Sequence, residues 1–442
     1  MRDSNRIPLV DVEQTAASSR NMAEASPPGS QHDQFTAWAK EQGVKINGVG
    51  PAKISGRGLG IIAQRRIEAG EELVNVPASA LLTINSIPQD FKALYQAISV
   101  HGLLSVFLAF GGSETSKYAP WTATWPLMQE FKESMPILWH SHLREPLRYD
   151  ARQTDCVDQK PAFLLPPAVG GRWRHIPELF EPREGVGLLA KQEQKFKADW
   201  KIVSKIFPNK TLEKYTYYWL IVNTRSFYFE VPGTADFAHE DRMVLCPFVD
   251  YFNHNDHGCD VVFDENGYTV ISDRAYEKGE ELRTSYGSHS NDFLLCEYGF
   301  ILENNKFDYL PLDDFFADKI LDSNTRESLE AAGYLGNYTL NSEGVCFRTQ
   351  VAIRKGTLST RDWKKFMAGT FEDDNKSREH AGMELYNRIL KPYESEAHEA
   401  LEHLKKMGDT VPGGVKEVLT RRWRQIRDLV QQAMDVHEFR RT

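Results

Sequence analysis

Three polar side chains in the second half of the chain are spaced so that they could bind a small ligand. Asp250, Asn253 and His254 belong to the run Phe-Val-Asp-Tyr-Phe-Asn-His, which we expect to be a strand that ends in a turn. Side chains in this arrangement can bond hydroxyl, ammonium and carboxylate groups, while apolar neighbours keep the pocket dry. The alternative is a polar turn that only closes a strand, because Asn-His-Asn-Asp is rich in turn formers.

A metal site is a second alternative for this segment. His254, His257, Cys259 and Asp260 offer imidazole, thiolate and carboxylate groups, all of which can coordinate zinc. Their spacing matches no zinc ligand pattern, and neighbouring residues of a strand point to opposite faces. We therefore expect no metal here.

A phenol precedes a glycine about thirty residues later. Tyr286 follows the run Gly-Glu-Glu-Leu-Arg-Thr-Ser, in which a Gly-Glu turn leads into a β run, and Glu-Tyr-Gly-Phe comes just beyond at residues 297–300. Near the start of the chain, the glycines of Arg57-Gly58-Leu59-Gly60 let a backbone turn lie close against a ligand. Each segment considered alone is more typical of a core tyrosine or of a turn glycine.

The order of these segments makes the pattern specific. It resembles the C-terminal half of a SET domain, the protein methyltransferase fold that uses S-adenosylmethionine. The resemblance implies that S-adenosylmethionine is the cofactor, that Tyr286 is catalytic and that a knot-like crossing forms at Asn253-His254. It also implies the residues that bind the cofactor, which are Arg57, Gly58, Leu59, Asp250, Asn253, His254 and Tyr286.

Methyl transfer to an amine sets a requirement that Tyr286 can meet. The reaction needs a neutral nucleophile, whereas a lysine with its ordinary pKa of about 10.4 is almost wholly protonated at pH 7. Deprotonating such a lysine at pH 7 costs on the order of 4 to 5 kcal/mol, and a narrow apolar channel beside a sulfonium lowers that cost. A phenol at the inner end can align the amine, and it adds no carboxylate that would keep the ammonium charged.

The resemblance also implies the residues that bind the substrate, which are Arg225, Phe227, Val249, Tyr298 and Phe300. Thr-Arg-Ser-Phe, which ends at Phe227, is similar to the Ser-Arg-Ala-Phe stretch of relatives that modify lysine. The actin-histidine methyltransferase branch has Asn at the Phe227 position and Trp at the Val249 position. A phenyl wall with a small neighbour suits an alkyl stem, whereas a neutral imidazole needs a hydrogen-bond partner. We therefore expect lysine rather than histidine.

The rest of the 442-residue chain predicts the elements that position these residues. Residues 1–32 lack an apolar period and are expected to be a disordered tail. Short β runs occupy about residues 44–84 and return at 243–285, with a type I′ hairpin signal at Asn266-Gly267. About residues 88–222 have helical patterns, and a long amphipathic helix lies near the C-terminus.

This order predicts an α+β fold with two parts. A β-rich SET domain with a pseudoknot covers residues 33–302 and is interrupted by the helical insertion, and an all-helical lobe covers residues 310–442. The order resembles the Rubisco large-subunit methyltransferase class, in which the helical lobe helps to hold the substrate protein. The sequence departs from that class between Glu230 and Asp241, which leaves the recognised polypeptide open.

Composition limits the partners and the compartment. A net charge of −9 argues against a nucleic-acid partner and suits a basic polypeptide. No apolar run approaches the roughly 20 residues that span a bilayer, so we expect no membrane partner. Five cysteines without a C-x-x-C pair fit a reducing compartment, and we expect a cytoplasmic protein, with the nucleus as the alternative.

We therefore expect an S-adenosylmethionine-dependent protein-lysine N-methyltransferase, whose partner is a protein that presents a lysine. The resemblance favours a ribosomal or translation protein over histones as the substrate. Two alternatives stay open, a catalytically silent relative that only binds a peptide and a protein-histidine N-methyltransferase. The presence of Tyr286, Asn253 and His254 counts against the silent relative.

Overall fold

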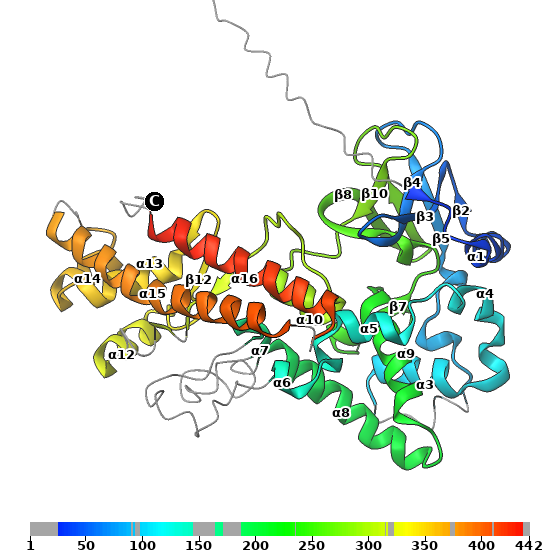
Figure 1. Cartoon of the computed structure of the whole chain (residues 1–442), viewed down its shortest axis with the longest axis horizontal. Coiled ribbons are helices and arrows are strands. Elements are labelled where there is room, and N and C mark those ends of the chain that lie inside the picture. The colour runs from blue at the N-terminus through cyan, green and yellow to red at the C-terminus, as the bar shows by residue number, and fades with distance from the viewer. Residues whose placement is uncertain are drawn as a thin grey trace, which may run out of the picture.

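The computed structural model describes residues 25–89, 92, 98–144, 164–170, 187–234, 236–313, 315–316, 322–371, 376–408 and 411–435. Figure 1 shows a β-rich part that carries both the N-terminal strands and the strands after residue 240, with a helical C-terminal lobe beside it. In the described residues, no helix is long and apolar enough to cross a bilayer.

Strands from both halves of the sequence share the largest sheet of the described residues. Its eight strands run in the order β1-β3-β4-β10-β8-β9-β5-β2. Their bounds are β1 Ala25–Ser26, β2 Lys45–Ile46, β3 Val49–Ile54, β4 Gly58–Ala63, β5 Glu72–Pro77, β8 Asn253–Asp264, β9 Gly267–Ile271 and β10 Glu281–Thr284. Because β10 lies between β4 and β8, the segments that carry the three motifs are neighbours in space, although the insertion separates them in sequence.

The β10–β8 pairing contains an abrupt shift in register. Arg283 pairs with Asn253, but the next residue, Thr284, pairs with Cys259, so residues 254–258 loop out of the ladder. Gly258 makes the close approach possible, because a Cβ atom there would lie 2.3 Å from the Arg283 carbonyl oxygen. We place the predicted knot-like crossing at this shift.

The insertion is helical, as predicted. Its α-helices in the described residues are α3 Val100–Phe110, α4 Ala119–Thr122, α5 Met128–Ser134, α6 Ser141–Arg144, α7 Pro167–Gly170, α8 Leu188–Ile206 and α9 Leu212–Arg225. Helices α4 and α5 are short and are separated by residues 123–127, which include Pro126. Helix α9 continues three residues past the expected end, until β6 Ser226–Tyr228 pairs with β7 Met243–Leu245.

Two local predictions are wrong in detail. The hairpin between β8 and β9 is confirmed, but its loop residues are Glu265 and Asn266, and Asn266 does not have the positive φ of a type I′ turn. The tail predicted over residues 1–32 extends too far. Ala25 pairs with Ile54, and α1 Ser30–Glu41 is anchored by buried Phe35. Residues 1–24 lie outside the described residues.

The C-terminal lobe is helical, as predicted, but it is not made of helices alone. Its helices in the described residues are α12 Ser323–Ala331, α13 Phe347–Thr357, α14 Thr360–Met367, α15 Lys376–Lys406 and α16 Gly413–Met434. A small sheet of β11 Leu310–Pro311, β12 Thr339–Asn341 and β13 Gly344–Val345 packs with them. Helices α15 and α16 lie side by side in Figure 1.

One hydrophobic core joins the lobe to the β-rich part. It combines buried residues of α15 and α16 with Leu295 and Cys296 of α10 Asn291–Tyr298, the helix that follows the tyrosine motif. Trp423 of α16 is fully buried in this core, and its indole N–H donates to the Leu164 carbonyl at 2.7 Å. The lobe is therefore part of the support of α10.

Candidate active site

Asn253 joins the N-terminal and C-terminal parts of the site. Its side-chain amide donates to the Leu59 carbonyl of β4 at 3.0 Å and to Glu281 Oε1 of β10 at 2.9 Å. Gly60 leaves room for this amide, because a Cβ atom there would lie 2.7 Å from Asn253 Nδ2. Gly58 has a φ of +75° and has no atom within 4 Å of a Cβ position, so this turn is open on its outer side.

Glu281 is a site residue that sequence reasoning missed. Its carboxylate accepts from Arg57 Nη1 at 2.6 Å and from Arg283 Nη2 at 2.7 Å, although only 6% of the side chain is exposed. Burial raises the pKa of Glu281, and the bonds from Asn253 and Arg57 oppose that shift. A signal was present in the sequence, because the two-residue spacing of Glu281 and Arg283 in a strand places both on one face.

Tyr286 lies directly against the Asn-His segment. Its hydroxyl donates to the Phe252 carbonyl at 2.6 Å, and its backbone N–H donates to His254 Nδ1 at 2.9 Å. The His254 and Tyr286 rings lie with their centroids 4.9 Å apart. Burial raises the pKa of Tyr286 above its usual range, so the group is a neutral phenol at pH 7.

His254 is a buried neutral imidazole. Burial is the main cause that lowers its pKa to about 4. Because Nδ1 accepts from Tyr286, Nε2 carries the proton, and this buried atom makes no hydrogen bond of normal geometry with a described residue, although the Thr284 backbone raises the pKa of the ring slightly. An unpaired buried donor of this kind fits a site that a ligand completes.

Tyr298 and Phe300 complete an aromatic group around Tyr286, and their contact with a substrate stays a prediction. The Tyr298 and Phe300 ring centroids lie 5.2 and 6.4 Å from that of Tyr286. Gly299 ends α10 in the left-handed conformation, with a φ of 80°, and a Cβ atom there would lie 2.9 Å from Ser134. This tight turn lets the residues on both sides of Gly299 reach the same tyrosine.

Arg225 and Asp250 form a buried pair behind the site. Arg225 Nη1 donates to the Asp250 carbonyl at 2.9 Å and lies 3.5 Å from its carboxylate, which also accepts from Trp121 Nε1 at 3.0 Å. Burial raises the pKa of Asp250, and Arg225 opposes the shift. The carboxylate thus fixes the start of the Asn-His segment to α9 and α4, and its direct contact with a cofactor stays a prediction.

Two further residues predicted to bind the substrate, Phe227 and Val249, make other contacts or are buried in a turn. The Phe227 ring packs edge-on against Tyr268 at 5.8 Å, and among the described residues it makes no ring contact with Tyr286. Val249 is buried in the short turn Val249–Tyr251. Their roles in substrate binding stay predictions. Within the described residues, no three His, Cys, Asp or Glu side chains gather as a metal site would require.

Arg422 of the C-terminal lobe is a second residue that sequence reasoning missed. It is fully buried in α16, where Nε donates to Asp292 of α10 at 2.5 Å and Nη1 donates to Asp308 at 2.6 Å. Gln425 of the same helix donates to the Leu302 carbonyl at 2.8 Å. These bonds hold both ends of the segment that carries Tyr298 and Phe300.

Comparison with known protein families gives two matches, one after the other along the chain. The model described as SET domain matches residues 58–287, which are 230 of the 442 residues. The model described as Ribosomal lysine N-methyltransferase 2 C-terminal domain matches residues 308–436.

Curated relatives carry related names. Ribosomal lysine N-methyltransferase set11 of Schizosaccharomyces pombe is 32% identical over 43% of this chain and 51% of its own. Ribosomal lysine N-methyltransferase 2 of Saccharomyces cerevisiae is 26% identical over 63% of this chain and 61% of its own. The alignments thus span between half and two thirds of these two proteins. SET domain-containing protein 4 of Homo sapiens is 24% identical over 86% of this chain and 84% of its own.

A solved structure has the same fold. Rubisco LSMT bound to sinefungin and monomethyllysine superposes with a TM-score of 0.55 at 15% identity, covering 92% of this chain and 91% of that one. The match extends over the β-rich part, the insertion and the helical lobe, so the arrangement expected from the order of elements is confirmed.

Proposed function

Because the chain belongs to the SET domain family, we propose that it is a protein-lysine N-methyltransferase that uses S-adenosylmethionine. One observation carries the proposal. The Tyr286 hydroxyl is bonded to the Phe252 carbonyl, and the next residue, Asn253, is bonded to Leu59 in the turn of the N-terminal half. The phenol and the two segments expected to bind the cofactor therefore meet at one place.

The residues at this place suit the proposed cofactor. Its sulfonium would supply an electrophilic methyl group. Arg57, the backbone of Leu59, Asn253 and the unpaired Nε2 of His254 offer the polar groups that would bind its charged and hydroxyl groups. The open outer side of Gly58 leaves space for a ligand against the backbone.

Tyr286 has the geometry to align a neutral amine. Its hydroxyl hydrogen is directed to the Phe252 carbonyl, so the phenol oxygen presents its remaining lone pairs to an N–H donor. The raised pKa keeps the phenol neutral, so it does not favour the ammonium form of the substrate. The Tyr298 and Phe300 rings add an apolar surround that lowers the pKa of a lysine amine by desolvation.

The proposed substrate is a ribosomal or translation protein. The family match over residues 308–436 and the names of the two yeast relatives support this choice. We propose that the protein acts in the cytoplasm, where such substrates are synthesised.

Methyl transfer to an extract tests the proposal. The purified full chain is incubated with tritiated S-adenosylmethionine and extract protein, and labelled peptides are analysed by mass spectrometry. We expect the label on lysine, and we expect Tyr286→Phe to reduce transfer by about 100-fold or more while the protein stays folded by circular dichroism. Absence of both cofactor binding and labelling contradicts the proposal, and a label on histidine contradicts its choice of residue.

A further inference from the structure

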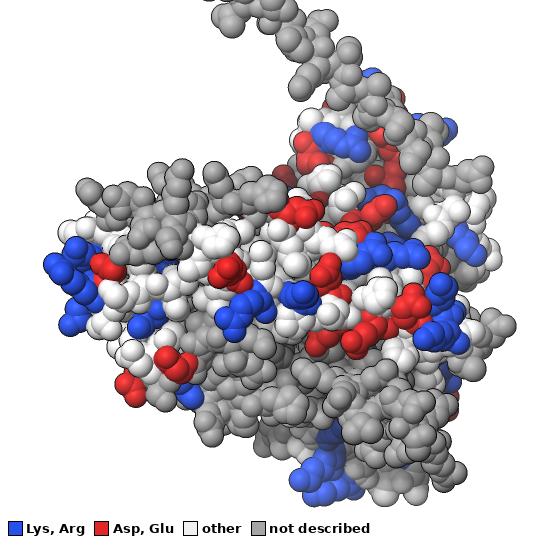
Figure 2. Space-filling model, turned by 60° about the vertical axis from the view of Figure 1, so that its left-hand side comes forward, with Lys and Arg blue, Asp and Glu red and all other residues white. Residues whose placement is uncertain are grey.

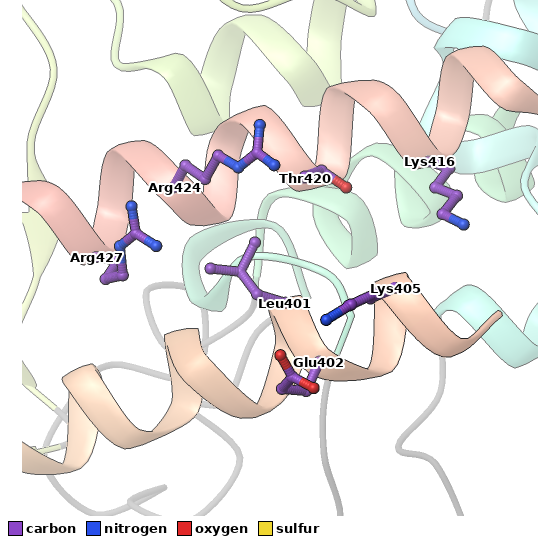
Figure 3. Close-up of a pocket in the computed structure, with 7 residues that line it drawn as sticks. All are labelled: Leu401, Glu402, Lys405, Lys416, Thr420, Arg424 and Arg427. Carbon is purple, nitrogen blue, oxygen red and sulfur yellow. The ribbon is translucent and has the colours of Figure 1, made fainter. Parts of the chain in front are cut away.

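A polar groove lies between α15 and α16, away from the aromatic group. Its volume is about 350 Å³. Figure 3 shows its two sides, with one row of side chains along α16 and one along α15. The lining residues are Leu401, Glu402, Lys405, Lys416, Thr420, Arg424 and Arg427.

Positive charge dominates this groove. Four cationic side chains line it with one carboxylate, although the whole chain has a net charge of −9. Arg427 pairs with Asp428, and Lys416 reaches the Gly408 carbonyl at 3.4 Å. Lys405 and Arg424 are exposed, and no described residue forms an ion pair or hydrogen bond with either of them. An anion in the groove would therefore gain two unshared cationic partners.

The spacing along α16 gives the length of the ligand. Lys416, Thr420, Arg424 and Arg427 follow one another at intervals of three or four residues, which places them on one face of the helix. From the first to the last, the helix rises about 16 Å at 1.5 Å per residue. An extended peptide covers this distance with about five residues.

The charges around the groove favour an acidic peptide over a nucleic acid. Asp428 and Glu417 are exposed on α16 next in sequence to the groove residues Arg427 and Lys416, so carboxylates interrupt the cations and leave no continuous basic track for a phosphate backbone. Figure 2 shows Lys and Arg interspersed with Asp and Glu on the face in view, without the broad basic stripe that nucleic acids require. Leu401 adds an apolar contact that suits a peptide side chain.

We propose that this groove binds an acidic segment of the substrate protein, about five residues long, at a distance from the lysine that is modified. The opposite face of α16 carries Arg422 and Gln425, which hold α10 and the residues after it. A substrate held in the groove is thus bound to the same helix that supports the active site. This inference rests on the proposed function for the identity of the partner, but not for the binding of an acidic peptide.

Peptide binding tests the chemistry of the groove directly. The probe is a fluorescein-labelled peptide of alternating Asp and Glu, six residues long, titrated with the full chain at low salt. We expect Lys405→Glu with Arg424→Glu to weaken binding by about tenfold or more, because two attractive contacts become repulsive. The matched control, Lys406→Glu with Arg421→Glu, changes exposed cations of the same helices outside the groove and should bind within about twofold of wild type.

Three results would overturn the inference. They are no saturable binding by the wild type, equal weakening in both double variants, and stronger competition by an oligothymidylate of equal charge than by unlabelled peptide.

Methyl transfer to extract protein then separates this inference from the proposed function. We expect the groove variant to label less at limiting extract and normally at saturating extract. Normal labelling at limiting extract contradicts the inference alone, whereas peptide binding with neither cofactor binding nor labelling contradicts only the proposed function.

Discussion

Asn253 connects three strands through a single amide group. Its Nδ2 atom serves both the Leu59 carbonyl and the Glu281 carboxylate, and the carboxylate in turn binds Arg57. The side chains that face the proposed cofactor therefore depend on one another for their positions. A change that moves the amide should affect the whole polar side of the site.

Gly60→Ala tests this dependence. The new Cβ atom would lie 2.7 Å from Asn253 Nδ2, so the amide has to move. We expect S-adenosylmethionine affinity, measured by isothermal titration calorimetry, to fall by about tenfold or more, as when one or two hydrogen bonds are lost. Gly56→Asn is the control, because Gly56 has open space around its Cβ position and Asn tolerates its φ of +72°. Unchanged affinity in Gly60→Ala would count against the role of Asn253.

The titration of His254 makes the stability of the folded protein depend on pH. Its pKa is about 4 when folded, against an ordinary value of about 6.5, so the unfolded state binds more protons between these limits. Stability contributed by the neutral imidazole is present above pH 6.5 and is lost as pH falls through 4. The full loss is on the order of 3 kcal/mol.

His254→Asn removes this titration. We expect the melting temperature of the wild type to fall more steeply between pH 7 and 5 than that of the variant, as followed by circular dichroism. The buried carboxyl groups with raised pKa values have the opposite sign, but they are common to both proteins and cancel in the comparison. Parallel pH profiles of the two proteins would contradict a buried neutral His254.

At the scale of elements, α16 supports the active site through α10. Arg422 is fully buried against Asp292 and bonded to Asp308, so it fixes the helix that ends at Tyr298. Burial raises the pKa of Asp292, whereas Arg422 opposes that shift. Loss of the guanidinium alone would leave a buried carboxylate without its partner.

Arg422→Met should therefore destabilise the protein by about 3 to 5 kcal/mol in urea denaturation. Arg422→Met combined with Asp292→Leu should recover part of this loss, because the two fully buried charges are then absent and only the partly exposed Asp308 stays without its partner. Arg421→Met, at the exposed neighbouring position, is the control and should stay within about 0.5 kcal/mol of the wild type. A similar stability for Arg422→Met and Arg421→Met would contradict the support of α10 by α16.

The elements were predicted well where their signals are local. The apolar period of α16 marks Val415, Leu419, Trp423 and Ile426, all of which are buried. The same period cannot identify Arg422 as a core residue, because its partners lie more than 100 positions earlier in the chain. The small sheet at residues 310–345 was missed because its strands are only two or three residues long.

At the scale of the whole molecule, the insertion separates two halves that meet at one site. Tyr286, Asn253 and the turn at Leu59 were placed together correctly because the order of their motifs resembles a known family. Contacts that no motif records could not be foreseen, such as Glu281 between Arg57 and Arg283. The role of Phe227 in substrate binding stays a prediction, because the contact that the structure shows for its ring is with Tyr268.

The central claim is that both halves of the chain form one binding site that meets the Tyr286 phenol. A crystal structure of the full chain with S-adenosylhomocysteine tests it most directly. We predict that the ligand contacts both the Leu59 backbone and the Asn253-His254 segment, with its sulfur on the Tyr286 side. A ligand bound elsewhere, or in contact with only one of the two halves, would contradict the account.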